Sequence, residues 1–236
     1  MKSSDLDGMQ HEKLLEALSN MFGTRIIGAE CETEQLHGGT LGDVKLVMGT
    51  AEAVDGGKLQ YKLVLKIQKK WERYGDPDSW RREYDLYASP LGSLFAGPLR
   101  WPRCYLAEMD GDEWRIWMEY IDGASGVNLT VGMLEQAAME LGRFQGRLYK
   151  ENPTWLECYR NMGTIDFMKA DYNQWEPTTV EYRYIRSGDC TLPKHLCRML
   201  LDMDDEIEAI FEKIKQLPIV FCHRDFWSKN IFYLGG

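Results

Sequence analysis

A histidine, an aspartate and an asparagine near the C-terminal end of the chain stand at a spacing that can assemble a reaction centre. The segment 223–230 reads His-Arg-Asp-Phe-Trp-Ser-Lys-Asn and follows the apolar run 217–221. In a phosphoryl-transfer loop of the form His-x-Asp-x-x-x-x-Asn, the aspartate accepts the proton of the attacking hydroxyl, and the asparagine gives an oxygen to a magnesium ion on the nucleotide phosphates. Asp225 and Asn230 fit these two roles. An Asp and an Asn in a loop also cap ordinary turns, so other elements of the chain must decide.

A glycine-rich segment in the first half of the chain is one such element. Gly39, Gly42 and Val44 match the second half of the pattern Gly-x-Gly-x-x-Gly-x-Val, and His37 stands where the first glycine of that pattern would be. Bare backbone amides in such a loop can approach phosphate oxygens. An ordinary glycine hairpin between two strands explains the same residues.

A lysine on a predicted strand is the second element. Side chains alternate with period two over 61–67, which places Leu63, Leu65 and Ile67 on one face of the strand and Lys66 on the other. A following helix over 80–87 carries Glu83, which can hold the lysine ammonium in place, and Asp78 or Ser79 is expected to cap that helix. Taken alone, Lys66 is more typical of a solvated strand lysine than of a ligand-binding one.

The remaining pattern predicts a strand-rich first half and a helical second half. Helices are predicted over 11–22, 134–148 and 196–214, and further strands over 24–35, 44–48, 103–108 and 114–121. Residues 151–193 are predicted to be irregular, with Pro153, Pro177 and Pro193 as breakers. A junction near 119–123 suggests two lobes with a cleft between them.

Composition and charge narrow the function class. The 236 residues are 44% hydrophobic and 28% charged, as expected of a globular protein, and the net charge of −9 argues against a nucleic-acid surface. No apolar stretch has the length of a membrane span or a signal peptide, which indicates a soluble, cytoplasmic protein without a membrane partner. The six cysteines contain no Cys-x-x-Cys pair, so neither a zinc site nor a disulfide framework is predicted.

The order of these elements resembles that of the kinase-like phosphotransferases typified by aminoglycoside phosphotransferases, choline kinases and related small-molecule kinases. The glycine loop, strand lysine, helix glutamate, hinge, helix and catalytic loop follow one another over essentially the whole chain. The resemblance implies an α+β, two-lobed protein kinase-like fold. Its N-lobe, residues 1–121, would bind nucleotide with an antiparallel five-stranded sheet and one helix. Residues 122–236 would form an incomplete, mainly helical C-lobe.

The resemblance also implies roles for individual residues. Asp225 would be the catalytic carboxylate and Asn230 a magnesium ligand. The nucleotide, ATP or GTP, would be held by the glycine loop, the lysine–glutamate pair and a hinge whose backbone binds adenine; the residues are Gly39, Gly42, Val44, Lys66, Glu83, Glu119, Tyr120 and Ile121.

Two departures from the family pattern stand out. Arg224 replaces the glycine usual in small-molecule phosphotransferases, and protein kinases have arginine at this position. The protein-kinase alternative is disfavoured, because Trp227 stands where a protein kinase has lysine and no Ala-Pro-Glu motif is present. The sequence stops at Gly236, before any counterpart of the Asp-Phe-Gly aspartate that binds magnesium. We therefore expect a further C-terminal part with that aspartate; the competing interpretation is a nucleotide-binding module without catalysis.

The expected reaction is transfer of the γ-phosphoryl group to a hydroxyl of a small molecule. A region of acidic and aromatic residues could bind a cationic acceptor, such as an aminoglycoside or choline, and the alternative is a polar surface with aromatics packed beneath it. These residues are Asp166, Asp171, Tyr172, Trp175, Glu176, Glu181, Tyr182 and Tyr184. The oligomeric state is not predicted.

Overall fold

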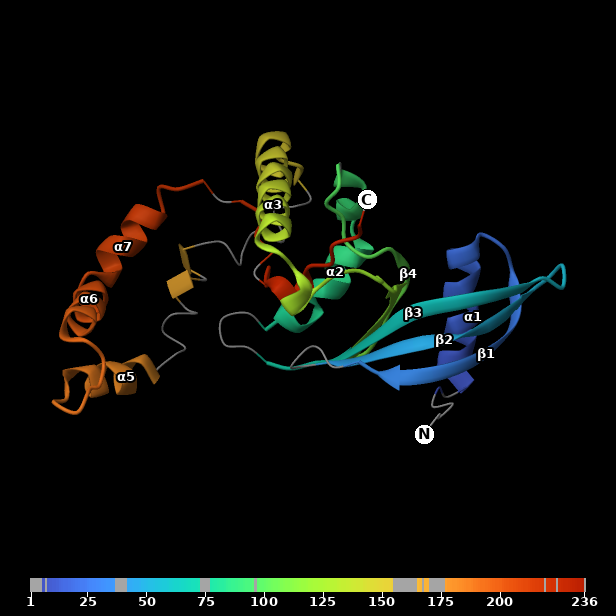
Figure 1. Ribbon diagram of the computed structural model, residues 1–236, viewed down its shortest axis with the longest axis horizontal. Helices are drawn as coiled ribbons and strands as arrows, with labels where there is room; N and C mark the ends of the chain where they lie inside the picture. The colour runs from blue at the N-terminus through green and yellow to red at the C-terminus, as the bar shows by residue number, and fades with distance from the viewer. Residues whose placement is uncertain are drawn as a thin grey trace. The chain divides into compact units, whose positions relative to one another are not determined.

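The computed structural model (Figure 1) describes residues 6, 8–36, 42–72, 77–95, 97–154, 165–166, 168–169, 177–218, 220–223 and 225–235, with the backbone alone for 177–181. The chain forms two compact units. The first, which we call the sheet unit, comprises residues 1–71, 78–144 and 225–236, and the second, the helical unit, comprises 72–77 and 145–224.

A five-stranded antiparallel sheet forms the centre of the sheet unit, with strand order β1-β2-β3-β5-β4. Tight turns join β2 to β3 and β4 to β5, and Gly56 and Gly111 take the positive φ angles, 83° and 56°, that these turns require. The protein is thus α+β, and the predicted five-stranded sheet is confirmed. The strands are β1 (Ile26–Gln35), β2 (Asp43–Ala53), β3 (Lys58–Lys69), β4 (Cys104–Asp110) and β5 (Glu113–Glu119).

Helix α1 (Gly8–Phe22) covers one face of this sheet. Its Leu14 and Leu18 are fully buried against Leu63, Leu65 and other apolar side chains of the sheet, as the predicted alternation requires. The helix ends at Gly23, whose φ of 67° suits a residue without Cβ. Burial of this apolar face is the main stabilising contribution in the sheet unit.

The opposite face of the sheet packs against a 3₁₀ turn, η1 (Ser79–Arg81), and helix α2 (Arg82–Ala88). Trp80 is buried there with Trp114, and the indole Nε1 of Trp114 donates to the carbonyl of Trp80 at 2.7 Å. The prediction that Asp78 or Ser79 caps this helix is wrong. The side chain of Asp78 makes no capping hydrogen bond, and Ser79 lies within η1, so the tryptophans fix the start of α2 by packing.

The second half of the chain is helical, with two differences from the sequence prediction. The single helix expected over 196–214 is broken at Glu206, near the negative C-terminal end of α6, where acidic residues at 202 and 204–206 are unfavourable although Arg186 lies 3.5 Å from Asp204 and Asp205. Pro177 begins a helix instead of interrupting an irregular segment, since proline is tolerated in a first turn. The elements are η2 (Pro90–Leu94), η3 (Gly126–Asn128), α3 (Val131–Glu151), α5 (Pro177–Arg186), α6 (Lys194–Asp205), α7 (Ile207–Ile214) and η6 (Ser228–Asn230).

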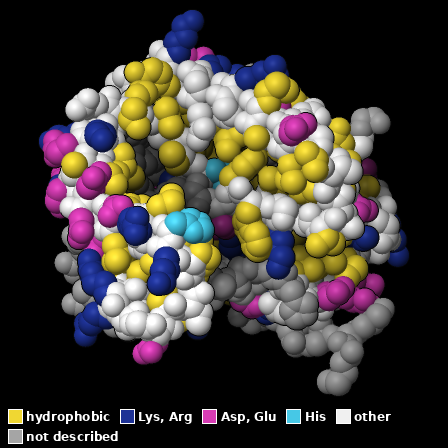
Figure 2. Space-filling view, turned by 60° about the vertical axis from the view of Figure 1, so that its left-hand side comes forward, with side chains coloured by type: hydrophobic (Ala, Val, Ile, Leu, Met, Phe, Trp, Pro, Cys, Tyr) yellow, Lys and Arg dark blue, Asp and Glu magenta, His cyan; other side chains and the backbone are white. Residues whose placement is uncertain are grey.

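The surface carries hydrophobic side chains between charged ones of both signs, as Figure 2 shows for one face. On α6, Leu196, Met199 and Met203 are exposed. Within the part of the chain that the structure describes, no helix is both long enough and apolar enough to cross a membrane.

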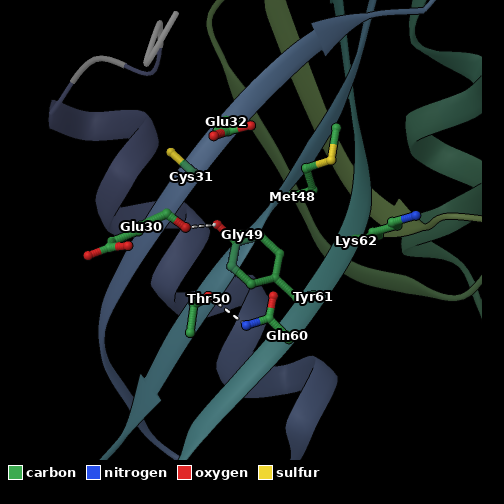
Figure 3. Close-up of a pocket in the computed structure, with 9 residues that line it drawn as sticks. All are labelled: Glu30, Cys31, Glu32, Met48, Gly49, Thr50, Gln60, Tyr61 and Lys62. Atoms are coloured by element: carbon green, nitrogen blue, oxygen red, sulfur yellow. Dashed lines mark hydrogen bonds between the residues drawn. The ribbon is translucent and has the colours of Figure 1, made fainter. Parts of the chain in front are cut away.

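One close approach in the sheet explains a glycine in the middle of β2. A Cβ on Gly49 would stand 1.9 Å from the carbonyl oxygen of Glu30 on β1. The buried ring of Tyr61 on β3 extends past Gly49, and its hydroxyl donates to that same carbonyl at 3.0 Å (Figure 3). Burial raises the pKa of the Tyr61 hydroxyl, so the hydroxyl stays protonated at neutral pH and remains a hydrogen-bond donor. The glycine and the tyrosine together join three strands.

We predict that Gly49→Ala lowers the free energy of unfolding by about 1–3 kcal/mol, because the new methyl group forces β1 away from β2. Urea unfolding followed by circular dichroism measures this change. Gly28→Ala is the matched control in β1, since a Cβ there meets no atom within 4 Å. Equal losses for the two variants would show that the close approach at Gly49 is not what matters.

Candidate functional site

Lys66 and Glu83 form an ion pair between β3 and α2. The ammonium Nζ lies 2.5 Å from Oε2 of Glu83, and the side chains are 27% and 38% exposed. The period-two alternation of β3 turns Lys66 toward α2 while Leu65 enters the core under α1. An ammonium has three donors and Glu83 accepts from one of them, so Lys66 can hold a further oxygen ligand without leaving its partner. The sequence prediction of this pair therefore corresponds to an observed contact.

Apolar side chains border the lysine on the same sheet face. Val44 on β2 stands directly opposite Lys66 in the strand register, and Val64 stands opposite Met118. Val64 packs against the cluster that contains the buried Met118. Val44 and Val64, both half-buried, thus place apolar side chains next to the Lys66 cation, while Met118 is buried beneath them.

The glycine loop is only partly within the described residues. Gly39 lies outside them. At Gly42, a Cβ would come within 2.9 Å of the Ile67 carbonyl oxygen, so this glycine is needed for the close approach of the loop to β3. The backbone N–H of Leu36 donates to the Val44 carbonyl at 2.8 Å and extends the pairing of β1 with β2 up to the loop. The hairpin interpretation thus accounts for Gly42, and a phosphate-binding role remains a prediction.

Glu119, at the end of β5, is fixed by two arginines. Its carboxylate accepts two hydrogen bonds from the Arg100 guanidinium, at 2.5 and 3.0 Å, and one from the backbone N–H of Arg103 at 3.0 Å. Its own N–H donates to the Arg103 carbonyl at 2.8 Å. Partial burial favours a higher pKa for Glu119, but these hydrogen bonds and the charge of Arg100 outweigh it, and the pKa is lowered.

This arrangement limits what the predicted hinge can offer to a ligand. The N–H and the carboxylate of Glu119 are both used inside the protein, whereas Tyr120 and Ile121 lie beyond the end of β5. The Tyr120 ring also has the Lys62 ammonium 5.6 Å from its centre. No sequence pattern predicts the contacts of Arg100 and Arg103 with Glu119, because these contacts depend on the pairing of β4 with β5.

Asp225 and Asn230 are joined by a hydrogen bond around η6. The Asn230 amide Nδ2 donates to Oδ2 of Asp225 at 2.6 Å and to its backbone carbonyl at 3.0 Å. The backbone N–H of Trp227 also donates to the Asp225 carbonyl, at 3.1 Å. Since the amide nitrogen is directed at Asp225, the amide oxygen of Asn230 points elsewhere and is the atom suited to bind a cation. An ordinary turn closed by an Asp and an Asn shares this geometry.

The segment 225–235 is attached to the chain that follows β5. Ala124 and Tyr233 exchange backbone hydrogen bonds of 3.0 and 2.8 Å, and η3 packs against η6. Gly123 permits this approach, because a Cβ there would stand 2.9 Å from the Tyr233 carbonyl oxygen. The Tyr233 hydroxyl donates to Gln136 of α3 at 3.3 Å. Asp225 and Asn230 thus belong to the same compact unit as Lys66 and Glu83.

Metal ligands are few around these residues. In the part of the chain covered by the structure, no group of three or more His, Cys, Asp or Glu side chains is placed to hold a metal ion. Magnesium in nucleotide sites usually takes one or two protein ligands, and waters and phosphates complete its six oxygens. Asp225 and Asn230 can supply two protein oxygens, which fits part of a magnesium site.

A hollow of about 670 Å³ lies elsewhere on the sheet, across β1, β2 and β3 (Figure 3). None of the predicted site residues lines it. Its lining mixes the charges of Glu30, Glu32 and Lys62 with Met48 and Gln60, and the Gln60 amide donates to the Thr50 hydroxyl at 2.7 Å. We assign it no part in the candidate site.

The residues predicted to bind a cationic acceptor lie in the helical unit and are only partly described. Asp171, Tyr172, Trp175 and Glu176 lie outside the described residues, as does the Glu181 side chain. Tyr182 is buried, and the Tyr184 hydroxyl bonds to the loop that follows α5. The buried Tyr182 presents no open ring face as an aromatic cage requires, which favours the packing interpretation for this residue, whereas Tyr184 is 45% exposed.

Comparison with known proteins adds no further identification: no family model, curated protein or solved structure matches the chain.

We predict that Glu119→Gln lowers the free energy of unfolding by about 1 kcal/mol at pH 7, since the charge-assisted bonds to Arg100 are lost in a partly solvated site. Because the folded-state pKa of Glu119 is lowered, the full difference in free energy of unfolding between wild type and variant is present above the unfolded-state pKa of about 4.3. This difference vanishes as the pH falls through the folded-state pKa, where Glu119 of the wild type becomes protonated. Urea unfolding between pH 3 and 7 measures it.

Glu52→Gln is the control for this experiment, because Glu52 is an exposed strand glutamate and its replacement should change stability by less than about 0.5 kcal/mol. A Glu119→Gln defect that stays constant down to pH 3 would contradict the assigned role of the carboxylate charge.

Proposed function

We propose that the chain belongs to an ATP- or GTP-dependent phosphotransferase that moves the γ-phosphoryl group to a hydroxyl of a small molecule. The observation that carries this proposal is the Lys66–Glu83 ion pair, which places a held ammonium on a sheet face beside Val44 and Val64. In a kinase-like N-lobe, a strand lysine held by a helix glutamate binds the nucleotide phosphates. The proposed fold is accordingly two-lobed and kinase-like, with residues 1–121 as the nucleotide-binding lobe.

Nucleotide binding in this proposal uses residues of the sheet unit. The half-buried side chains of Val44 and Val64 receive the base, and the backbone of Glu119, Tyr120 and Ile121 bonds its edge. Because the Glu119 N–H already donates to Arg103, the proposal uses the other backbone groups of this segment. Lys66 neutralises phosphate charge without losing Glu83.

Asp225 acts on the acceptor. Its Oδ2 accepts from Asn230, which fixes the plane of the carboxylate, and the carboxylate orients the acceptor hydroxyl and takes its proton as the oxygen attacks phosphorus. Positioning and charge neutralisation supply most of the catalysis in such transfers. Magnesium on Asn230 would offset phosphate charge, but since the described donors do not complete its site, no step is assigned to it.

A nucleotide-binding module without catalysis is the second candidate function. The sequence contains Asp166-Phe167 and Asp225-Phe226, but neither pair is followed by glycine, so an Asp-Phe-Gly motif is absent from these 236 residues. A protein with only this function needs Lys66 and the hinge, whereas Asp225 is dispensable. The acceptor class, cationic or neutral, and a cytoplasmic location stay predictions.

Lys66→Met tests the nucleotide site directly. We expect it to weaken ATP binding, measured by isothermal titration calorimetry, about 10- to 100-fold, because the loss of one charge-assisted bond costs about 1.5–3 kcal/mol. Lys58→Met is the matched control, an exposed lysine that the period-two alternation places on the same face at the far end of β3. Equal binding by wild type and both variants would reject the nucleotide site.

Asp225→Asn separates the two candidate functions. If the chain catalyses transfer, the variant binds ATP as wild type does but loses at least about 10²-fold in ATP consumption with a panel of amino sugars, quaternary amines and neutral sugars. Asp112→Asn, in the exposed β4–β5 turn, is the control. Binding of ATP without any consumption by wild type would favour the binding module, and an active Asp225→Asn variant would remove Asp225 from the mechanism.

A further inference from the structure

Two cysteines of the helical unit lie in contact although the sequence gives no Cys-x-x-Cys motif. Cys190 is in the loop between α5 and α6, Cys197 is in the first turns of α6, and their Sγ atoms are 3.6 Å apart. Both side chains are half-buried, so a small solute can reach them. The Cys197 thiol is also within 3.7 Å of the Leu192 carbonyl, which places it on the loop side of the helix.

A tyrosine fixes the loop on both sides of Cys190. The Tyr184 hydroxyl donates to the Asp189 carbonyl at 3.2 Å and accepts from the Thr191 N–H at 3.2 Å. Ser187 adds a second support, since its hydroxyl donates to the Tyr184 carbonyl at 2.7 Å and accepts from the Asp189 N–H at 3.4 Å. The backbone that presents Cys190 to Cys197 is therefore held by four hydrogen bonds from two side chains of α5 and its end.

We propose that Cys190 and Cys197 form a dithiol site that reacts reversibly with low-molecular-weight disulfides, such as glutathione disulfide, to give an intramolecular disulfide. A disulfide has an S–S distance of about 2.05 Å, so the sulfurs must approach by about 1.6 Å. Rotation about the Cα–Cβ bond of Cys190, with a small shift of its loop, supplies this movement while Cys197 stays on its helix.

The reaction consists of two thiol–disulfide exchanges. The thiolate of Cys190 attacks one sulfur of glutathione disulfide, a mixed disulfide forms, and one glutathione thiolate leaves. The thiolate of Cys197 then attacks the Cys190 sulfur, and the second glutathione thiolate leaves. Two electrons pass from the protein to the glutathione, whose thiolates take up the two protons that the cysteines release.

The order of attack follows from the surroundings of the two thiols. Desolvation, together with the neighbouring Cys190, raises the pKa of the Cys197 thiol, so this thiol is the slower one to attack a solute. As the second nucleophile it attacks within the same molecule, where a high effective concentration compensates for a smaller thiolate fraction. Lys194, one turn before Cys197 on the same side of α6, provides a cation that favours approach of anionic glutathione.

Oxidation of the whole chain in a glutathione buffer tests the site. After incubation at a defined ratio of glutathione to its disulfide, free thiols are blocked with N-ethylmaleimide and peptides are mapped by mass spectrometry. We expect one internal link, between Cys190 and Cys197, that forms at ratios where the other four cysteines remain reduced, and that dithiothreitol reverses.

Single-cysteine variants give the contrast. Cys190→Ser and Cys197→Ser should lose the internal link and keep glutathione on the remaining cysteine, whereas Cys222→Ser, which removes an exposed thiol, should form the link as wild type does. Tyr184→Phe should lengthen the lifetime of the mixed disulfide several-fold, because the loop is less well fixed. Circular dichroism checks that each variant is folded.

Three results would overturn the proposal. The first is a wild-type protein that stops at the mixed disulfide, and the second is a link between either cysteine and another one. The third is a link that joins two chains. Each would show that the observed contact between the sulfurs does not lead to a bond in solution.

Discussion

The Lys66–Glu83 ion pair is the interaction on which the candidate site depends. Helix α2 has only seven residues and no side-chain cap at its start, so it is too short to be stable by itself. It is held by the packing of Tyr84 and Tyr87 against the sheet and by the charge of Lys66. A single ionic contact thus ties the helix to the strand and leaves the ammonium at the edge of an apolar face. Loss of either partner would leave a half-buried charge beside hydrophobic side chains.

The sequence was most informative where one periodicity decided the outcome. In β3, alternation alone separated Leu63 and Leu65 from Lys66, and the register places Val44 opposite the lysine. The contacts that were not predicted join residues far apart in the chain or depend on local charge. Arg100 meets Glu119 only because β4 pairs with β5, and Tyr61 reaches Glu30 only because β2 has a glycine between them. The helix break at Glu206 lies in an acidic segment that a hydrophobic pattern does not reveal.

The placement of the segment 225–235 has a consequence for how the site is held together. The chain leaves the sheet unit within α3 and returns to it at Asp225, where Ala124 and Tyr233 pair. The backbone pairing of Ala124 with Tyr233 and the packing of η3 against η6 therefore hold the segment that carries Asp225 and Asn230 within the sheet unit.

The role of the Asp225 carboxylate is what distinguishes the two candidate functions in physical terms. A protein that only binds nucleotide gains from Lys66 and from a free hinge edge, but a second carboxylate near the phosphates would oppose binding by charge repulsion. In an enzyme, by contrast, the carboxylate must be held in one orientation to receive a proton from the acceptor. The Asn230 amide, which donates to one oxygen of Asp225, holds it in this way. An ordinary turn forms the same bond, so the enzyme differs from the binding module only if Asp225 acts on a substrate. The retained nucleotide binding and lost turnover expected of Asp225→Asn are the consequences that a turn does not share.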